Sequence, residues 1–185
     1  MSHILVMIAN RAKINSTFSL KDLAGSAGRL DVVCRVVLSF QESKTFDTLY
    51  LVLRGMNVPI SLVLQKDVKK FYTEQEVALD IKSAILGMPS RFSLLNMDYE
   101  SVLESLSKDH TLVLLEETGS DILSYSLGND NYAFILGDDK GFLEEQILYM
   151  KKICDVSISL GNIPYLSSQV VAILDYVLSK CIEVI

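Results

Sequence analysis

The sequence predicts an α/β domain in which a mostly parallel sheet is covered by helices on both faces. Its 185 residues are half hydrophobic, which is enough for one domain with a sizeable core. Strand-length apolar runs alternate with helical patterns, as in parallel α/β folds. The strand runs are continuously apolar, so both faces of each strand are expected to be buried. Because no linker or repeat divides the chain, we expect residues 1–185 to form one domain.

The first half of the chain predicts a strand, a helix and a hairpin. Residues 4–9 are an apolar run expected to form a buried strand, and the polar residues 10–17 are expected to form a loop. Between residues 30 and 38, apolar side chains recur three and four positions apart, which places them on one helix face. Residues 48–55 and 59–65 then predict two strands joined as a hairpin.

In the second half of the chain, helix-capping residues and an alternation of strand and helix patterns predict the elements. Thr73 and Glu76 have the spacing of a capping box ahead of a helix that the Gly-Met-Pro at 87–89 should end. Asp98 can cap a short helix over residues 99–108. The elements expected after it are a strand at 111–116, a loop at 117–130, a strand at 132–138, a helix at 142–152, a strand at 155–161 and a helix at 166–178.

Composition excludes several classes of protein. The net charge is −6 and charges of both signs are interleaved, so any nucleic-acid contact needs a local basic patch. Cys34, Cys154 and Cys181 are far apart, which predicts no disulfide framework or zinc site and favours a reducing cytoplasm. The N-terminal apolar stretch lacks a cationic segment before it, and the C-terminal run is interrupted by polar residues. We therefore expect neither a signal peptide nor a membrane span.

Three strand ends are the candidate binding loops, because parallel α/β sheets bind ligands at the carboxyl ends of their strands. Polar or glycine residues follow the expected strands at Glu116–Gly119, Gly137–Gly141 and Ser159–Asn162. Each loop is equally compatible with ordinary turn chemistry. Serine-hydrolase, Walker and zinc-protease motifs are absent from the sequence, and His3 and His110 are isolated, so no metal site is expected.

The stretch from Phe18 to Phe40 concentrates charge beside an apolar helical face. Gly25 and Gly28 give only G-x-x-G, which is not a dinucleotide loop, so one interpretation is a turn that leads into a helix. The other is a site, because carboxylates and guanidiniums gather there and suit acid–base work or phosphate contact. The charged residues concerned are Asp22, Arg29, Asp31 and Arg35.

Three segments resemble one known family. KDLAGSAGRLDVVCRVV, residues 21–37, resembles the N-terminal signature of the archaeal tRNA pseudouridine-54 N1-methyltransferases. FILGDDKGF, residues 134–142, is similar to the family's I-G-D-H-x-G segment, and residues 158–178 resemble its I-S-L-S-P-L segment and the following helix. The similarity runs in one order over nearly the whole chain.

The resemblance implies a fold and a cofactor. Members are SPOUT methyltransferases, homodimers with a deep trefoil knot near the C-terminus that bind S-adenosylmethionine through loops of the knot. Those loops correspond here to residues 115–119, 137–141 and 158–163. The cofactor-binding residues it implies are Leu115, Glu116, Gly137, Asp138, Gly141, Ile158, Leu160, Gly161 and Ile163.

The implied reaction is methylation of N1 of pseudouridine 54 in the T-loop of tRNA. A carboxylate would help to remove the N1 proton, and Asp22 is the first candidate and Asp31 the second. Arg29 and Arg35 would hold the flipped nucleotide or its phosphates. Further expected contacts to RNA phosphates are Arg11, Lys13 and Lys21.

Departures from the family pattern keep two alternatives open. Asp139 stands where the family has histidine, Ala24 and Asn162 stand where it has proline, and Val170 where it has a cysteine near the cofactor. In the first alternative, the methyl acceptor is a pseudouridine in ribosomal RNA instead of tRNA. The other alternative is a dimeric module that binds cofactor or RNA without catalysis. No metal or membrane partner is expected.

Overall fold

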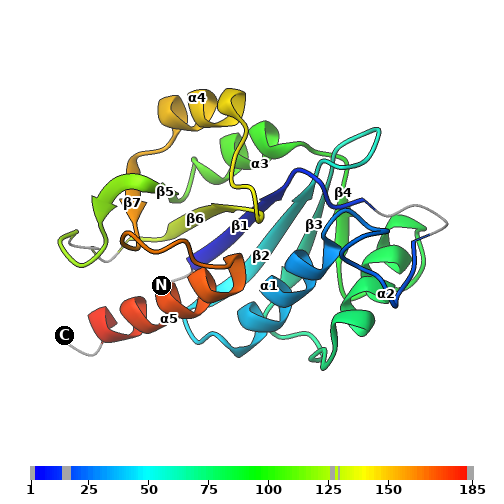
Figure 1. The fold of residues 1–185 in the computed structure, drawn as a ribbon. Helices are drawn as coiled ribbons and strands as arrows, with labels where there is room; N and C mark the ends of the chain where they lie inside the picture. The colour runs from blue at the N-terminus through cyan, green and yellow to red at the C-terminus, as the bar shows by residue number, and fades with distance from the viewer. Residues whose placement is uncertain (1–2, 14–17, 126–127, 129, 183–185) are drawn as a thin grey trace.

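A seven-stranded sheet lies between two layers of helices in the computed structural model, which describes residues 3–13, 18–125, 128 and 130–182 (Figure 1). The elements are β1 (His3–Ala9), α1 (Leu30–Glu42), β2 (Phe46–Leu53), β3 (Ile60–Gln65), α2 (Glu74–Ile85), β4 (Ser93–Leu95), α3 (Tyr99–Leu106), β5 (Thr111–Asp121), β6 (Tyr132–Gly137), α4 (Glu144–Ile153), β7 (Val156–Ser159) and α5 (Ser167–Ile182). Residues 14–17 of the first expected loop, residues 126, 127 and 129 of the second, and the Cys181 side chain lie outside the described part.

The sheet order is β4-β3-β2-β1-β6-β5-β7. β1 pairs in parallel with β2 and β6, and β5 pairs in parallel with β6 and β7. β3 is antiparallel to both β2 and β4. The predicted mostly parallel sheet and the predicted hairpin are thus confirmed.

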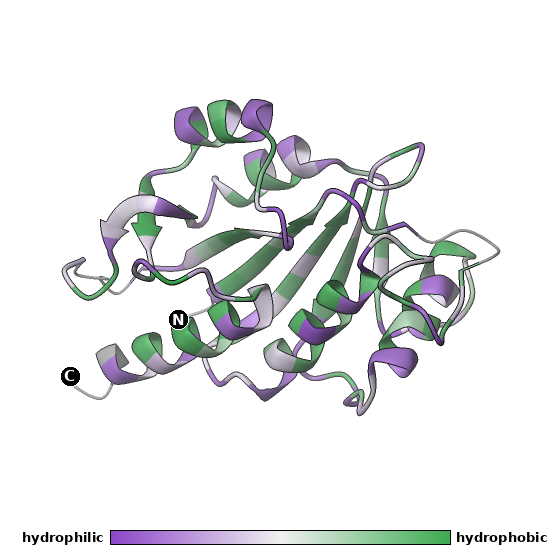
Figure 2. Cartoon of the chain, in the orientation of Figure 1, coloured by the Kyte–Doolittle hydropathy of each residue, from purple (hydrophilic) through white to green (hydrophobic). Residues whose placement is uncertain are grey.

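Two apolar cores cover the two faces of this sheet. α1, α2 and α5 pack on one face, and α3 and α4 pack on the other (Figure 1). All seven residues of β1 are buried, as its continuous apolar run predicts. Figure 2 shows the same pattern, with hydrophobic residues concentrated along the inner strands. The strands thereby form a rigid platform whose carboxyl ends carry the loops.

The predicted helix caps form as expected. The Thr73 hydroxyl accepts a hydrogen bond from the Glu76 N–H at 3.1 Å, and the Glu76 carboxylate accepts one from the Tyr72 N–H at 2.7 Å. Asp98 accepts a hydrogen bond from the Tyr99 N–H at 2.7 Å, and α3 begins there. These bonds satisfy N–H groups that have no partner inside a helix.

Most elements differ from the predictions by about two residues at an end, and three differences are larger. The expected loop at 117–130 is wrong in its first part, because β5 continues to Asp121 after an outward excursion over residues 116–119. Leu115 and Ser120 both pair with Ile158 of β7, so a partner distant in the sequence extends the strand. α5 ends at Ile182 rather than at 178. β4 was not predicted, because three residues carry too short a pattern.

α5 is fastened to α1 and to the connection between α1 and β2. The Asp175 carboxylate accepts hydrogen bonds from the Lys44 N–H at 2.7 Å, the Thr45 N–H at 2.9 Å and the Thr45 hydroxyl at 2.8 Å. The Ser39 hydroxyl donates to the Ser168 carbonyl at 2.9 Å. These bonds hold the last helix on the first half of the chain.

We expect Asp175→Ala to lower the free energy of unfolding by about 1.5–3 kcal/mol, because three donors lose a charged acceptor. Urea unfolding followed by circular dichroism measures the change. Asp67→Ala, at an exposed position between β3 and α2, is the matched control and should change the free energy by less than about 0.5 kcal/mol. Equal effects of the two substitutions would contradict the anchoring role of Asp175.

Candidate active site

The loops that follow β1 and β6 are joined at the carboxyl edge of the sheet. The Asn10 N–H donates to Asp138 Oδ2 at 2.8 Å. The Asn10 and Gln146 side-chain amides exchange two hydrogen bonds, of 3.0 and 2.7 Å. Arg11 directly follows Asn10, and Asp139 directly follows Asp138. Both Arg11 and Asp139 carry charges of the site. Their backbones are therefore fixed before any ligand binds.

The chain after β1 passes between two glycines. A Cβ atom on Gly28, which has φ +60°, would lie 1.9 Å from the Arg11 carbonyl oxygen, and one on Gly55 would lie 2.4 Å from the same oxygen. The Lys13 N–H also donates to the Ala27 carbonyl at 3.1 Å. Gly28 therefore allows a close backbone approach, as the turn interpretation of this stretch predicts.

Asp22 stabilises the turn ahead of Gly28. Its Oδ1 accepts a hydrogen bond from the Gly25 N–H at 2.8 Å, and its Oδ2 accepts one from the Ser26 N–H at 3.0 Å. Such side chain to backbone bonds are typical of aspartate in turns. Within the described residues, no ion pair connects Asp22 or Lys21 to the arginines of the site. A role for Asp22 in proton transfer stays a prediction.

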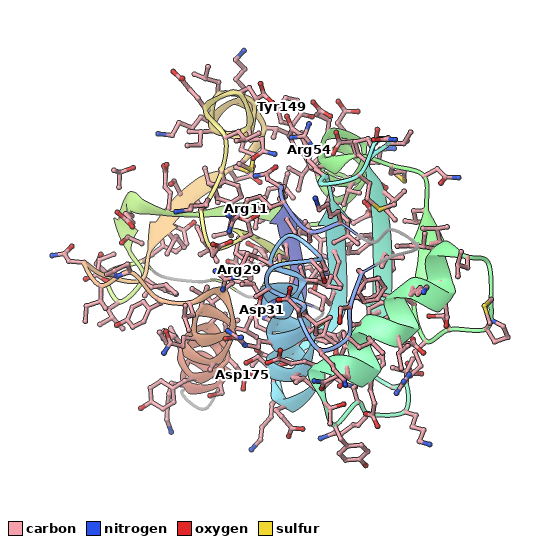
Figure 3. All side chains as sticks on the ribbon, turned by 45° about the vertical axis from the view of Figure 1, so that its right-hand side comes forward. Arg11, Arg29, Asp31, Arg54, Tyr149 and Asp175 are labelled. Atoms are coloured by element: carbon pink, nitrogen blue, oxygen red, sulfur yellow. The ribbon has the colours of Figure 1, made fainter. Side chains whose placement is uncertain are left out.

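Arg29 is the centre of the site and adopts an unusual backbone conformation. Its φ of 66° and ψ of 35° lie in the left-handed region. Among the described residues, no other non-glycine residue has a positive φ. Nε and Nη2 donate to the two oxygens of Asp31 at 2.9 and 3.2 Å, and Nη1 donates to Asp139 Oδ2 at 3.2 Å. A left-handed residue costs about 1–2 kcal/mol, which these three charged bonds offset. Figure 3 shows Arg11, Arg29 and Asp31 in sequence from the end of β1 to α1.

Two further arginines complete a network of alternating charges. Arg11 forms an ion pair with the same Oδ2 atom of Asp139. Arg35 donates to Asp31 Oδ2 at 2.8 Å and to Glu74 Oε1, at the start of α2, at 2.9 Å. We call Arg11, Arg29, Asp31, Arg35, Glu74 and Asp139 the arginine network.

The arginine network fixes the charge of Asp31. Its side chain is 6% exposed, and burial acts to raise the pKa of this carboxyl. The hydrogen bonds and charges of Arg29, followed by the charge of Arg35, outweigh burial and leave that pKa below its usual value. The hydrogen bond to Asp31 likewise raises the pKa of Arg29. Asp31 is therefore a stable anion that orients the arginines on either side of it.

Hydrogen bonds connect the segments at and beside the three loops expected to bind the cofactor. The Ser167 hydroxyl donates to the Gly137 carbonyl at 3.0 Å, which links the end of β6 to the start of α5. The Ile122 N–H donates to the Ser159 carbonyl at 3.0 Å, which links β5 to β7. The Ser159 hydroxyl also accepts from the Gly161 N–H at 3.1 Å. These three loops thus lie at one edge, as the predicted parallel sheet requires.

Glycines shape these loops in two different ways. A Cβ on Gly119 would lie 2.6 Å from the Ile158 backbone, so this glycine permits the contact between β5 and β7. Gly141 and Gly161 have φ of +70° and +110°, and a Cβ on either would meet no atom within 4 Å. Open space beside a left-handed backbone is suited to a ligand that approaches the main chain. Glu116 is held by the Ser157 hydroxyl at 2.6 Å.

Exposed apolar side chains and carboxylates both occur near this edge of the sheet. Large apolar side chains are exposed on the segments that follow β5, β6 and β7, and the carboxylates of the buried Asp138 and the partly buried Asp139 lie at the end of β6. Apolar walls with a few placed polar groups are typical of cofactor sites. The exposed side chains are Leu123, Leu143, Ile163 and Leu166, with exposed fractions of 81%, 46%, 62% and 51%.

The structure brings some of the predicted site residues together and leaves others apart. Arg11, Arg29, Asp31 and Arg35 join in the arginine network, next to the buried Asp138, whereas Lys13 and Lys21 are exposed outside it. Asp139, Asn10 and Gln146 were not among the predicted residues. For Asp139 a signal was present, because it belongs to a Gly-Asp-Asp run that directly follows a strand.

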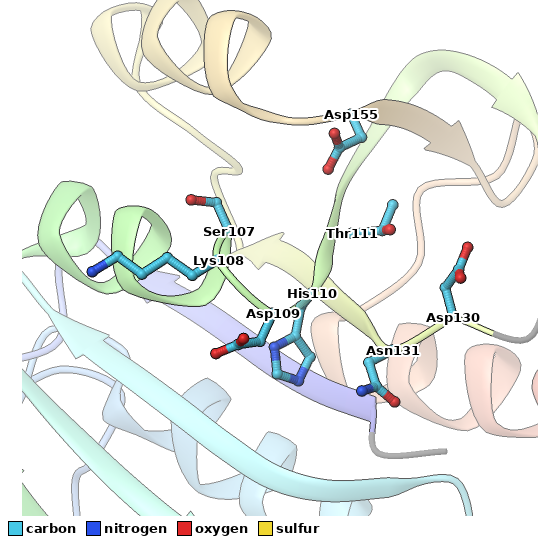
Figure 4. A pocket seen from close by; sticks show the side chains of 8 residues that line it. All are labelled: Ser107, Lys108, Asp109, His110, Thr111, Asp130, Asn131 and Asp155. Atoms are coloured by element: carbon cyan, nitrogen blue, oxygen red, sulfur yellow. The ribbon is translucent and has the colours of Figure 1, made fainter.

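A polar hollow lies at the opposite edge of the sheet from these loops (Figure 4). Its volume is about 480 Å³, and it lies where β5, β6 and β7 begin. Parallel sheets bind ligands at the other edge, and within the described residues no group of three or more His, Cys, Asp or Glu side chains could hold a metal. The hollow is lined by Ser107, Lys108, Asp109, His110, Thr111, Asp130, Asn131 and Asp155.

In the described part of the chain, no helix has the length and hydropathy that a membrane span needs.

Comparison with known proteins decides the family. Residues 1–181 match a family model described as "Putative SAM-dependent RNA methyltransferase". The tRNA (pseudouridine(54)-N(1))-methyltransferase of Pyrococcus abyssi is 31% identical, covering 96% of this chain and 97% of the relative. The protein of the same name from Methanopyrus kandleri is 32% identical, covering 94% and 90% of the two chains. The chain belongs to this methyltransferase family.

Solved structures agree with this family on the fold. Archaeoglobus fulgidus Nep1, bound to S-adenosylhomocysteine, superposes with a TM-score of 0.66 at 14% identity, covering 97% of this chain and 98% of that one. The SpoU methyltransferase AviRb from Streptomyces viridochromogenes, in complex with AdoMet, gives 0.50 at 8% identity over 95% of this chain and 57% of the other. The α/β fold is therefore that of the SPOUT methyltransferases, as predicted.

We expect Gly28→Ala to destabilise the protein by at least about 2 kcal/mol more than Gly87→Ala, because a Cβ at Gly28 overlaps the Arg11 carbonyl. Gly87 also has positive φ, +68°, but its Cβ would meet nothing within 4 Å, so that variant isolates the conformational cost. Urea unfolding of both variants measures the difference. Similar losses would show that the close approach at Arg11 is unimportant.

We expect the stabilisation by Asp31 to disappear in acid. Because the pKa of the folded state lies below the usual value of 3.8, the contribution is fully present above that pH and is lost as the pH falls through the lowered folded pKa. The gap in unfolding free energy between wild type and Asp31→Asn should therefore narrow below about pH 3.8. A gap that is constant with pH would contradict the ion pairing.

Proposed function

We propose that the protein is an S-adenosylmethionine-dependent methyltransferase that methylates N1 of pseudouridine 54 in tRNA. The observation that carries this proposal is the 3.2 Å bond from Arg29 to Asp139. It joins the segment most similar to the family signature to a loop 110 residues further along the chain. The two curated relatives named above support the choice of tRNA and of position 54.

S-adenosylmethionine fits the loops that follow β5, β6 and β7. When bound, it supplies a methyl group that is already electrophilic. The exposed apolar side chains of these loops would enclose the adenosyl group, and the main chain at Gly141 and Gly161 would lie close to it. The residues proposed for binding are Leu115, Glu116, Gly137, Asp138, Gly141, Ile158, Leu160, Gly161 and Ile163.

The arginine network faces the proposed RNA. Arg11 and Arg35 have side chains 43% and 41% exposed, so their guanidiniums can reach phosphate. Lys13 and Lys21 are exposed and would add contacts near the same turn. These residues form the local basic patch that we propose on an otherwise acidic protein. Contacts to phosphate would offset the few kcal/mol, roughly, that unstacking the target base costs.

Arg29 is the residue that we propose to position the target nucleotide. Asp31 binds its guanidinium on two nitrogens and Asp139 on the third, so the group has one orientation. Positioning of this kind lowers the barrier by removing motions of the reactants in advance. Asp31 acts on the nucleotide through Arg29, and its role as proton acceptor stays a prediction.

We further propose a cytoplasmic homodimer with the C-terminal trefoil knot of SPOUT proteins. A hollow of about 520 Å³ between α1 and α5 and the 64% exposed Tyr176 on α5 leave surface for a second subunit. The free thiols of Cys34 and Cys154 are compatible with a reducing compartment.

We expect 1-methylpseudouridine to form when the protein is incubated with S-adenosylmethionine and tRNA that carries pseudouridine 54. Nuclease digestion and mass spectrometry identify the product. tRNA with uridine at position 54 is the matched control, because N1 of uridine carries the ribose and has no proton. Arg29→Lys should reduce turnover about 100-fold or more, since one ammonium cannot replace three oriented N–H donors.

The two alternative functions predict different outcomes. Product on a ribosomal RNA fragment that contains pseudouridine, without product on tRNA, would replace the proposed substrate. Tight binding of S-adenosylmethionine by calorimetry, with no methyl transfer to any cellular RNA fraction, would indicate a binding module instead of an enzyme.

A further inference from the structure

Four aspartates lie at or beside the arginine network, and three of them have both oxygens occupied. Asp22 accepts two backbone N–H groups, and Asp138 accepts the backbone N–H groups of Asn10 and Lys140 at 2.8 and 2.9 Å. Asp31 accepts three guanidinium N–H groups. Each oxygen of these three carboxylates therefore already accepts at least one hydrogen bond.

Asp139 is different from the other three. Its Oδ2 carries both ion pairs, to Arg11 and to Arg29, whereas its Oδ1 is buried and has no hydrogen-bond partner among the described residues. A buried acceptor without a donor costs about 1–3 kcal/mol, so such atoms are rare outside functional sites. Among the carboxylate oxygens of these four aspartates, Oδ1 of Asp139 is therefore the one without a donor among the described residues, and it is closed to solvent in the free protein.

Arg11 is the partner of Asp139 that is able to leave. Its side chain is 43% exposed, and its pair with Asp139 is its one ion pair within the described residues. Its backbone stays in place, because Gly28 and Gly55 lie against its carbonyl group. Arg29, in contrast, is held by two bonds to Asp31 as well. A phosphate near this edge would therefore compete with Asp139 for Arg11.

We propose that Asp139 Oδ1 accepts the N1 proton of the target base, and that an RNA phosphate activates this carboxylate by drawing Arg11 away from Oδ2. The inference rests on the proposed function. Removing one of two cations from Asp139 makes the carboxylate a stronger acceptor. In this proposal the departure of Arg11 from Oδ2 also frees the carboxylate to turn and present Oδ1, which is buried in the free protein, so proton acceptance follows RNA binding.

The step is balanced in atoms and electrons. The N1–H bond breaks as its proton passes to Oδ1, and N1 uses the electron pair to bond to the methyl carbon. The carbon–sulfur bond breaks with its pair on sulfur, which yields 1-methylpseudouridine and neutral S-adenosylhomocysteine. The proton then leaves Asp139 for water when the product departs.

Asp139→Asn separates the two roles, because it keeps the shape of the side chain and removes its charge. Without cofactor, this variant should bind tRNA about two- to fivefold more tightly than wild type, since Arg11 no longer has a competing carboxylate. With cofactor, its single-turnover rate should fall about 100-fold or more, as expected for loss of proton transfer. Filter binding and rapid-quench measurement give the two quantities.

Two further variants control the experiment. Asp139→Glu restores a carboxylate and should recover at least about a tenth of the wild-type rate. Asp109→Asn, at the opposite edge of the sheet, changes the net charge by the same amount and should leave both quantities unchanged. Thermal unfolding and circular dichroism establish that each variant is folded.

Each measurement tests one of the two parts of the proposal, the competition for Arg11 or the acceptance of the proton. Unchanged or weaker tRNA binding by Asp139→Asn would overturn the competition for Arg11, and a wild-type single-turnover rate would overturn proton acceptance. Failure of the proposed function is a separate result, because the wild-type protein would then form no 1-methylpseudouridine. The binding comparison between wild type and Asp139→Asn remains decisive even in that case.

Discussion

The Asp139 carboxylate binds two guanidiniums on one oxygen, and the geometry of the site depends on this contact. Arg11 comes from the end of β1 and Arg29 from the start of α1, while Asp139 follows β6. Segments distant in the sequence thereby meet at one atom. Because a partly buried charge is costly without partners, each of the three side chains restricts where the other two can lie. The left-handed backbone of Arg29 is one consequence of that restriction.

The backbone around this contact is held by apolar and steric constraints. β1 is buried along its whole length, and the residue that follows it is bonded to Asp138 on one side and to Gln146 on the other. The next carbonyl, that of Arg11, lies against two glycines. This combination fixes the main chain while leaving the Arg11 side chain 43% exposed. A fixed backbone with an exposed guanidinium is well suited to the exchange of a carboxylate for a phosphate that we propose for Arg11.

The parts of this structure that sequence patterns predicted are those set by local physical chemistry. The buried central strands follow from continuous apolar runs, and α2 follows from the reciprocal bonds of Thr73 and Glu76. The second half of β5 escaped prediction because its polar residues extend only by pairing with Ile158 and Ser159. Within the arginine network, the pair of Asp31 and Arg35 could be predicted because the two residues are four apart on one helix. The contact between Arg29 and Asp139 could not, because 110 residues separate them in the sequence.

The distribution of hydrogen bonds also separates two tasks that we propose for different carboxylates, orienting the arginines and accepting a proton. Asp31 orients Arg29 and Arg35 because both of its oxygens accept guanidinium N–H groups, and these contacts keep its pKa below the usual value. A proton acceptor needs an oxygen without a competing donor, which at this edge Asp139 provides. The motif that is most similar to the family signature therefore supplies the positioning groups. The acceptor comes from another loop, and the ion pair between Arg29 and Asp139 couples the two.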